Sequence, residues 1–261
     1  MSATAAAQRA SARLAGASLV QRIGSLALLA AVWQIAAVAA HSRMLPSAGA
    51  VLAALVQLTL HGTLLFNLGI TLARVAAAFV VAMIIGTAIG IVMGRSRTID
   101  VLFDSWLVLL LNLPALVIIV LAYVWFGLTE AAAIGAVAVN KIPAVAVTLR
   151  EGARALDRNY AEMAESFHVG RWRTLRHVIM PQLYPYIFAA ARSGLALVWK
   201  IVLIVELLGL SNGVGFEIQL YFQQFDVTHI LAYTIAFVAV IQVIEWALFQ
   251  PLERRAGRWR R

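Results

Sequence analysis

The sequence predicts an all-α membrane protein with six transmembrane helices, both termini in the cytoplasm and a cytoplasmic loop between the fourth and fifth helices. Of its 261 residues, 62% are hydrophobic and 13% are charged, whereas a soluble domain carries about 25% charged residues. Several apolar runs are long enough for a helix to cross a hydrocarbon core of about 30 Å. Backbone groups in lipid must be hydrogen-bonded within their own segment, and the strict alternation of an outer-membrane strand is absent, so the runs are predicted to be helices.

The apolar runs define one membrane domain over residues 23–249, between a tail at 1–22 and a basic tail at 250–261. Pro114 interrupts the third run, where it is expected to bend the helix. The remaining length leaves no room for a second globular unit. The six runs cover approximately residues 23–40, 64–94, 101–126, 131–149, 184–208 and 230–249.

Arginine placement predicts the orientation. With the N-terminus inside, the cytoplasmic segments hold 16 arginines and the outer loops hold only Arg43, a bias that the positive-inside rule requires. A cleavable signal peptide ending near Ala39 is the alternative for the first run. Cleavage is disfavoured because the run is longer than a usual signal core and its loss would leave five spans with mismatched termini.

The segment between the first two runs predicts a short helix along the outer interface. Leu45-Pro46-Ser47 puts Pro and Ser near the N-terminus of a helix over residues 48–61, and His61-Gly62 is expected to turn the chain into the second run. These residues are too few to form another span.

A polar island at Arg150–Pro181 separates the fourth and fifth runs and carries six arginines. It predicts two short helices: Asp157 can cap the first, Gly170 offers the break between them, and Pro181 is expected to close the second.

The first of these short helices has an apolar stripe made of Met163, Ala164 and Phe167. An exposed apolar patch indicates a protein partner. The alternative, a solvated loop touching anionic lipid headgroups, accounts for the arginines but not for this stripe.

The island resembles the EAA loop of ATP-binding cassette importer permeases, and the resemblance extends over most of the chain toward the nitrate, sulfonate and taurine branch. Glu162-Met163-Ala164 stands at the start of the motif and Pro181 at its end. The family pattern has alanine where this chain has Met163 and glycine where it has His168. The resemblance implies a coupling helix at about Tyr160–His168 that docks on a cytoplasmic ATPase subunit. The implied coupling residues are Glu162, Met163, Ala164, Phe167, His168, Gly170 and Pro181.

The same resemblance implies an inner-membrane permease that moves a small anion, such as nitrate, a sulfonate or taurine, by alternating access. Two copies, expected to be a homodimer, would enclose the pathway, and a substrate-binding protein would deliver from outside. ATP and Mg would bind the ATPase subunit, because a P-loop needs Gly-Lys and the two lysines, Lys141 and Lys200, follow Asn and Trp. The chain is therefore not expected to be an enzyme or to hold a cofactor. An ion-gradient-driven secondary transporter and a membrane scaffold are the alternatives.

Ionisable residues inside the runs cost roughly 2.5–3.5 kcal/mol each, so each needs a reason. Lys200 lies near mid-span and would suit an anion; a structural ion pair is the alternative for it and for Glu206. The candidate pathway residues are Asn112, Pro114, Lys200 and Glu206. No catalytic set is recognised, and the five histidines have no metal-ligand spacing.

Overall fold

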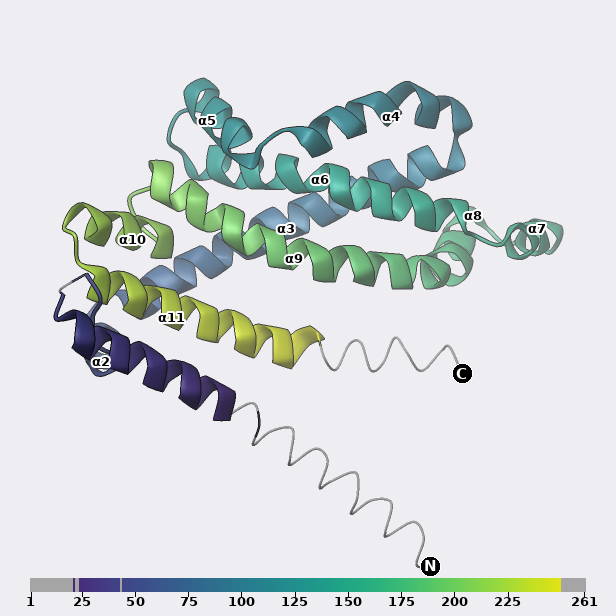
Figure 1. Ribbon diagram of the computed structural model, residues 1–261. Coiled ribbons are helices and arrows are strands. Elements are labelled where there is room, and N and C mark those ends of the chain that lie inside the picture. The colour runs from purple at the N-terminus through teal and green to yellow at the C-terminus, as the bar shows by residue number, and fades with distance from the viewer. Residues whose placement is uncertain (1–20, 22–23, 43, 250–261) are drawn as a thin grey trace, which may run out of the picture.

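The computed structural model describes residues 21, 24–42 and 44–249, which form helices joined by short loops (Figure 1). Residues 1–20, 22–23, Arg43 and 250–261 lie outside this part, so the predictions for both tails and for Arg43 fall on residues that the structure does not describe. The order of the helices is Gly24–Ala40, α2 (Ala48–His61), α3 (Leu64–Arg95), α4 (Arg97–Asn112), α5 (Ala115–Phe126), α6 (Glu130–Arg154), α7 (Arg158–Ser166), α8 (Arg171–Thr174), a π-helical turn (Leu175–Ile179), α9 (Met180–Gly209), α10 (Val214–Gln223), α11 (Val227–Ile244) and a second π-helical turn (Glu245–Phe249).

Four described helices are long and apolar enough to cross a membrane, and α4 with α5 supplies a fifth crossing if the pair is counted as one. The four are Leu64–Arg95, Glu130–Arg154, Trp172–Gly209 and Val227–Ala247. The helix Gly24–Ala40 is apolar but shorter. The all-α class is confirmed for the described residues, whereas the six-span count stays a prediction.

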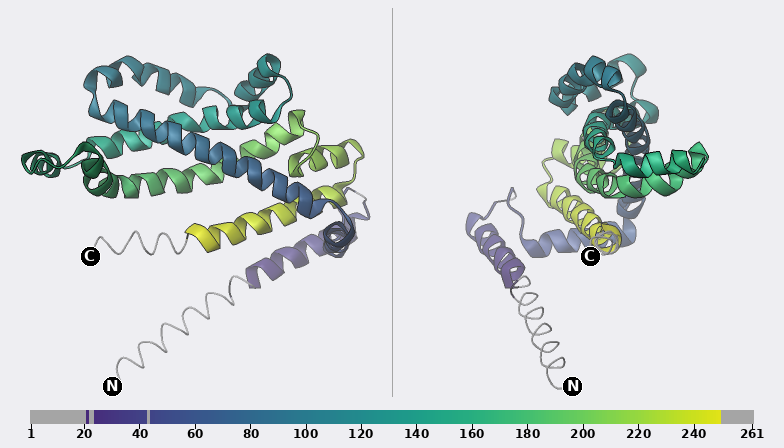
Figure 2. Two further views of the ribbon diagram at one scale, coloured as in Figure 1. Left: turned by 180° about the vertical axis from the view of Figure 1, so that it is seen from behind. Right: turned by 90° about the vertical axis from the view of Figure 1, so that its right-hand side faces the viewer.

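α3, α6, α9 and α11 run along the length of the bundle, and α3 crosses it diagonally behind α9 (Figures 1 and 2). α2 and α10 lie at one end of the bundle, here called the α10 end. α7 and α8 lie at the other, the α7 end. The larger apolar core cluster includes residues of α2, α5 and α10, and a smaller cluster is formed by the parts of α6 and α9 nearer α7.

α3 and α6 approach closely along a stripe of glycines. A Cβ on Gly86 would lie 2.6 Å from the Cβ of Val145, and one on Gly90 would lie 2.5 Å from the carbonyl oxygen of Ala146. Small residues let membrane helices pack backbone to backbone, where dispersion contacts replace a hydrophobic driving force. This contact makes α3 and α6 the most extensively packed pair in the bundle.

The prediction that Pro114 bends the third run is confirmed, and the change of direction is sharp. α4 and α5 meet at an angle of 96°. Leu113 has an extended backbone with ψ 127°, as expected of a residue before proline, and Pro114 caps α5.

The short helix before the second span is also confirmed. The side chain of Ser47 accepts a hydrogen bond from the backbone N–H of Ala50 at 3.2 Å, and the helix ends at His61 before Gly62.

The prediction that Pro181 closes a separate second helix is wrong. The chain is helical from Trp172 to Gly209, and Pro181 lies in the first turn of α9. The π-helical turn Leu175–Ile179 comes just before it. A proline cannot donate a backbone hydrogen bond and its ring crowds the preceding turn, and a wider turn at this place accommodates both effects.

Candidate functional site

α7 projects from the bundle at its α7 end (Figures 1 and 2). The side chain of Asp157 accepts a hydrogen bond from the backbone N–H of Asn159 at 2.9 Å, which confirms the predicted cap. The backbone N–H of Asp157 donates to the side-chain oxygen of Gln182 at 3.1 Å. The start of α7 is therefore tied to the start of α9, so a force on α7 has a direct route to a long helix.

The outward surface of α7 and the following turn is apolar. The side chains of Met163 and Phe167 are 51% and 76% exposed. Ala164, predicted to share their stripe, is only 4% exposed and faces inward. The exposed apolar residues, here called the α7 patch, are Tyr160, Met163, Phe167, Val169 and Trp172. Large side chains of this kind, rimmed by polar residues, indicate a surface that another protein covers.

The turn after α7 contains a residue in the left-handed region. His168 has φ 50°, and the backbone N–H of Val169 donates to the carbonyl of Ala164 at 2.8 Å, the six-to-one bond of a Schellman cap. Glycine is favoured at such a position, because a side chain there is strained. Gly170 lies in the break between α7 and α8, as predicted, but the left-handed residue of the turn is His168, at the position where the family pattern has glycine.

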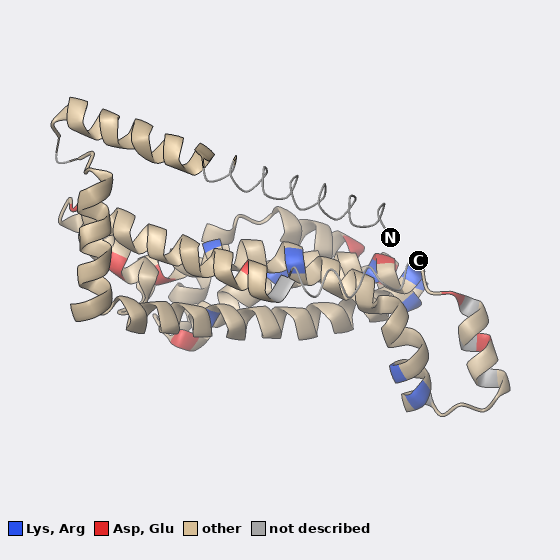
Figure 3. Cartoon of the chain, turned by 90° about the horizontal axis from the view of Figure 1, so that it is seen from below, with Lys and Arg blue, Asp and Glu red and all other residues tan. Residues whose placement is uncertain are grey.

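Charged residues gather at the α7 end, and few lie along the middle of the bundle (Figure 3). Arg150 of α6 pairs with Asp104 of α4 at 2.5 Å and with Asp100 at 3.3 Å. Arg154 also pairs with Asp100. These two arginines, counted in the sequence only as an orientation signal, also hold α4 against α6.

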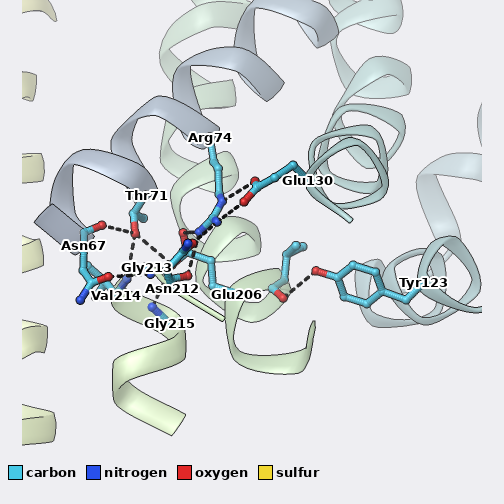
Figure 4. Close-up of polar contacts among 11 residues, drawn as sticks. Asn67, Thr71, Arg74, Tyr123, Glu130, Glu206, Asn212, Gly213, Val214 and Gly215 are labelled. Carbon is cyan, nitrogen blue, oxygen red and sulfur yellow. Dashed lines mark hydrogen bonds and ion pairs between the residues drawn. The ribbon is translucent and has the colours of Figure 1, made fainter. Parts of the chain in front are cut away.

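A second polar cluster is buried at the α10 end (Figure 4). Glu206 is completely buried. Its carboxylate accepts hydrogen bonds from the guanidinium of Arg74 at 2.7 Å, the hydroxyl of Thr71 at 2.9 Å and the backbone N–H of Gly215 at 2.9 Å. A buried charge persists only when it is paired and hydrogen-bonded, and these three donors meet that condition.

Arg74 connects this carboxylate to α6 and to the loop before α10. Its Nε donates to Glu130 at 2.8 Å, and its Nη1 donates to the carbonyl of Asn212 at 2.9 Å. The Nη2 atom of Arg74 contacts the side-chain oxygen of Asn212. One guanidinium thus holds together α3, α6, α9 and the loop, as Figure 4 shows.

The backbone N–H groups of Gly213 and of the first two residues of α10 are bound to side chains of α3 and α9. The N–H of Gly213 donates to the Asn67 side chain at 2.9 Å, and the N–H of Val214 donates to Thr71 at 2.9 Å. With the bond from Gly215 to Glu206, three successive donors are satisfied by side chains. Non-helical backbone is tolerated at membrane depth only where protein satisfies it in this way.

The four candidate pathway residues lie in different places. Asn112 is at the end of α4 and donates to the carbonyl of Val108 at 2.7 Å, and Pro114 precedes α5. Glu206 belongs to the buried cluster and binds Arg74, which agrees with the alternative that it forms a structural ion pair. Lys200 is exposed on α9 and lines a cavity between α9 and α11.

The sequence of this chain matches a known family of membrane transport proteins. A family model described as the inner membrane component of binding-protein-dependent transport systems matches residues 85–249, which is more than half of the chain. The chain belongs to this family.

Named relatives of this permease agree with that assignment. It is 29% identical to the taurine transport system permease protein TauC of Escherichia coli K12 over 91% of its own length and 88% of TauC. It is 30% identical to the E. coli K12 permease protein SsuC, named for aliphatic sulfonate transport, over 88% of both chains. The bicarbonate transport system permease protein CmpB of Synechococcus elongatus is 29% identical over 65% of this chain and 62% of CmpB.

Two solved structures share the fold of the permease. One is a chain of an amino acid ABC transporter crystallised with histidines, with TM-score 0.59, 22% identity and coverage of 78% of this chain and 97% of that one. The other is from the inward-facing MetNI methionine ABC transporter, with TM-score 0.62, 16% identity and coverage of 72% and 94%. At these identities the likeness supports the fold alone.

Sequence reasoning located the polar island of the permease and missed the α10-end cluster. Arg74 and Glu206 stood out as intramembrane charges, but they are 132 positions apart in the sequence and nothing local pairs them. Gly213 and Gly215 carried a usable signal, because glycines beside a buried acid indicate close backbone approach.

Proposed function

We propose that this chain is the permease subunit of an ATP-driven importer for a small anion, and that α7 is its coupling helix. The observation that carries the proposal is the α7 patch: an amphipathic helix with an outward apolar surface, projecting from a membrane bundle whose family serves binding-protein-dependent transport. The names of TauC, SsuC and CmpB support an anionic or sulfonate-bearing substrate.

The proposed assembly has two copies of the permease around one pathway, with both termini in the cytoplasm. A separate ATPase subunit binds ATP and Mg at the α7 end. A substrate-binding protein docks at the α10 end, where α2 and α10 lie. Closure of the ATPase pair moves α7, and the hydrogen bond from Asp157 to Gln182 passes that motion to α9 during alternating access.

The residues of this chain that are proposed to contact the ATPase are the exposed members of the set predicted from the sequence. Met163 and Phe167 would enter an apolar groove, and the exposed carboxylate of Glu162 would meet its polar rim. His168, Gly170 and Pro181 shape the turn and its return to α9, and Ala164 packs inside the loop. Large side chains at the centre of an interface carry most of its energy, often 2 kcal/mol or more each.

The test is co-purification of a P-loop ATPase with the full-length chain from membranes. Phe167→Ala should lower the amount of bound ATPase at least tenfold, and Glu162→Lys should lower it as well. Phe222→Ala, on α10 at the other end and similarly exposed at 66%, is the matched control and should leave ATPase binding unchanged. Normal ATPase binding and normal uptake by both α7 variants would overturn the coupling role.

A further inference from the structure

The face shared by α9 and α11 carries polar groups where a membrane protein is expected to be apolar. On α9, Arg192 and Lys200 are exposed. On α11 and the turn after it, Thr234 and Glu245 are exposed. All four line one cavity of about 370 Å³ between the two helices, which lies within the size range of small-ligand sites.

These groups lie on one stripe of each helix. The α9 residues that line the cavity include Arg192, Leu195 and Lys200, whose spacing keeps them on one side. The α11 residues recur at similar intervals, and the cavity separates the two stripes. The α11 lining is Thr234, Phe237, Val238 and Ile241, followed by Glu245.

The depth of the cations along α9 argues against a lipid-facing position. Lys200 lies nine residues before the end of α9 at Gly209, about 14 Å along the helix, and Arg192 lies 12 residues after its start at Met180, about 18 Å. Charges at such depth face a bundle interior or a water-filled cavity, because exposure to hydrocarbon costs several kilocalories per mole. The described protomer leaves this face uncovered, so a second wall is needed.

The charge balance of the face selects the sign of its ligand. Two cations and one carboxylate leave a net positive charge, and the carboxylate, Glu245, directly follows the last residue of α11. Thr234 lines the same wall, and its hydroxyl donates to the backbone carbonyl of Ile230 at 2.8 Å. Leu195, Trp199 and Leu203 supply apolar walls, which strengthen electrostatic attraction by excluding water.

We propose that this groove, here called the α9–α11 groove, is half of an anion-selective transport pathway that a second copy of the chain completes. Lys200 and Arg192 attract an oxyanion such as a sulfonate, Thr234 lines the wall opposite them on α11, and the same residues of the second copy form the other half of the pathway. This inference rests on the proposed permease function and assigns the residues that set its substrate charge.

The chain has no cysteine, so a single introduced thiol can report the local charge without any transport measurement. We would express full-length Thr234→Cys in inner-membrane vesicles. It is then labelled with two water-soluble methanethiosulfonates, one bearing a sulfonate and one bearing a trimethylammonium group. Each rate is divided by the rate of the same reagent with a free thiol in solution. On that scale the sulfonate reagent should react faster, and adding Lys200→Met should lower the ratio of anionic to cationic rates by about tenfold, as expected for the loss of one nearby unit charge.

Matched variants separate this effect from a change in folding. Lys200→Arg should keep the anion preference, and Lys200→Gln should lose it as Lys200→Met does. Ala239→Cys, exposed on a different side of α11, should show no rate ratio that depends on Lys200.

Two results would overturn the proposal. One is a rate ratio at Thr234→Cys that Lys200→Met and Lys200→Gln leave unchanged. The other is reaction of that thiol with N-ethylmaleimide but with neither charged reagent, which would place the face against lipid or packed protein. Labelling needs neither ATP nor the ATPase, so failure of α7 docking would leave this result intact, and failure here would leave α7 docking intact.

Discussion

The two sets of intramembrane charges in this permease differ in how completely protein surrounds them. At the α10 end, Arg74 and Glu206 are buried and hydrogen-bonded to each other and to neighbouring groups. In the α9–α11 groove, Arg192, Lys200 and Glu245 are exposed at the wall of a cavity. Satisfied burial indicates charges that fix the structure, whereas exposure at membrane depth indicates charges that meet water and cargo.

The largest expected loss of stability is that of a variant without Arg74. Arg74→Met should leave the completely buried Glu206 without its cation, which costs about 3–5 kcal/mol. The thermal unfolding temperature of the purified chain in detergent should fall by several degrees, and the yield of folded protein should fall with it.

Lys200→Met is the matched control for this prediction, because it also exchanges a long cation for methionine within a span. Its unfolding temperature should stay close to that of the wild type. Equal unfolding temperatures for the two variants would contradict the claim that Arg74 fixes the structure and Lys200 does not.

Gly213→Ala tests the same difference at the loop between α9 and α10, which the buried cluster holds in place. Gly213 has φ 104°, and a Cβ there would lie 2.4 Å from the carboxyl carbon of Glu206. The strained backbone and the displaced carboxylate should together cost about 2 kcal/mol, seen as a lower unfolding temperature. Gly49→Ala, where a Cβ meets nothing within 4 Å, should lower it far less, and an equal loss in both variants would contradict the close approach.

The smallest expected effect concerns the turn after α7. His168→Gly removes a side chain from a backbone at φ 50°, which should stabilise the turn by about 1 kcal/mol. The amide of Val169, bonded to Ala164, should then exchange with solvent about fivefold more slowly in a hydrogen-exchange measurement. Gly170→Ala should leave that rate nearly unchanged, and faster exchange in His168→Gly would contradict the left-handed turn.

The sequence was sufficient to predict features that depend on local chemistry. The all-α class, the short helix that begins after Ser47, the cap at Asp157 and the break at Pro114 follow from residue types over a few positions. The position of α7 within the polar island followed from polarity and the EAA resemblance. The described part of the chain bears out each of these features.

Features that depend on contacts between distant segments could not be predicted in this way. Ala164 lies in α7 and Phe167 directly follows that helix, yet only the fold of the loop shows that Ala164 faces inward. The π-helical turn before Pro181 likewise depends on how the loop returns to α9. Lys200 lines a cavity and Glu206 is completely buried, although only six residues separate them on one helix. No local sequence pattern distinguishes these two environments.

ATP-driven uptake of a radiolabelled aliphatic sulfonate, measured per folded transporter in vesicles with the proposed ATPase and binding protein, tests the division between the two regions most directly. Such a sulfonate is a net anion of the proposed substrate class, and it is named for the relative SsuC. We expect Lys200→Met to assemble with the ATPase and unfold at the wild-type temperature but to take up the sulfonate at least tenfold more slowly, whereas Arg74→Met loses folded protein. Uptake by Lys200→Met at the wild-type rate, together with an Arg74→Met protein as stable as the wild type, would contradict this division.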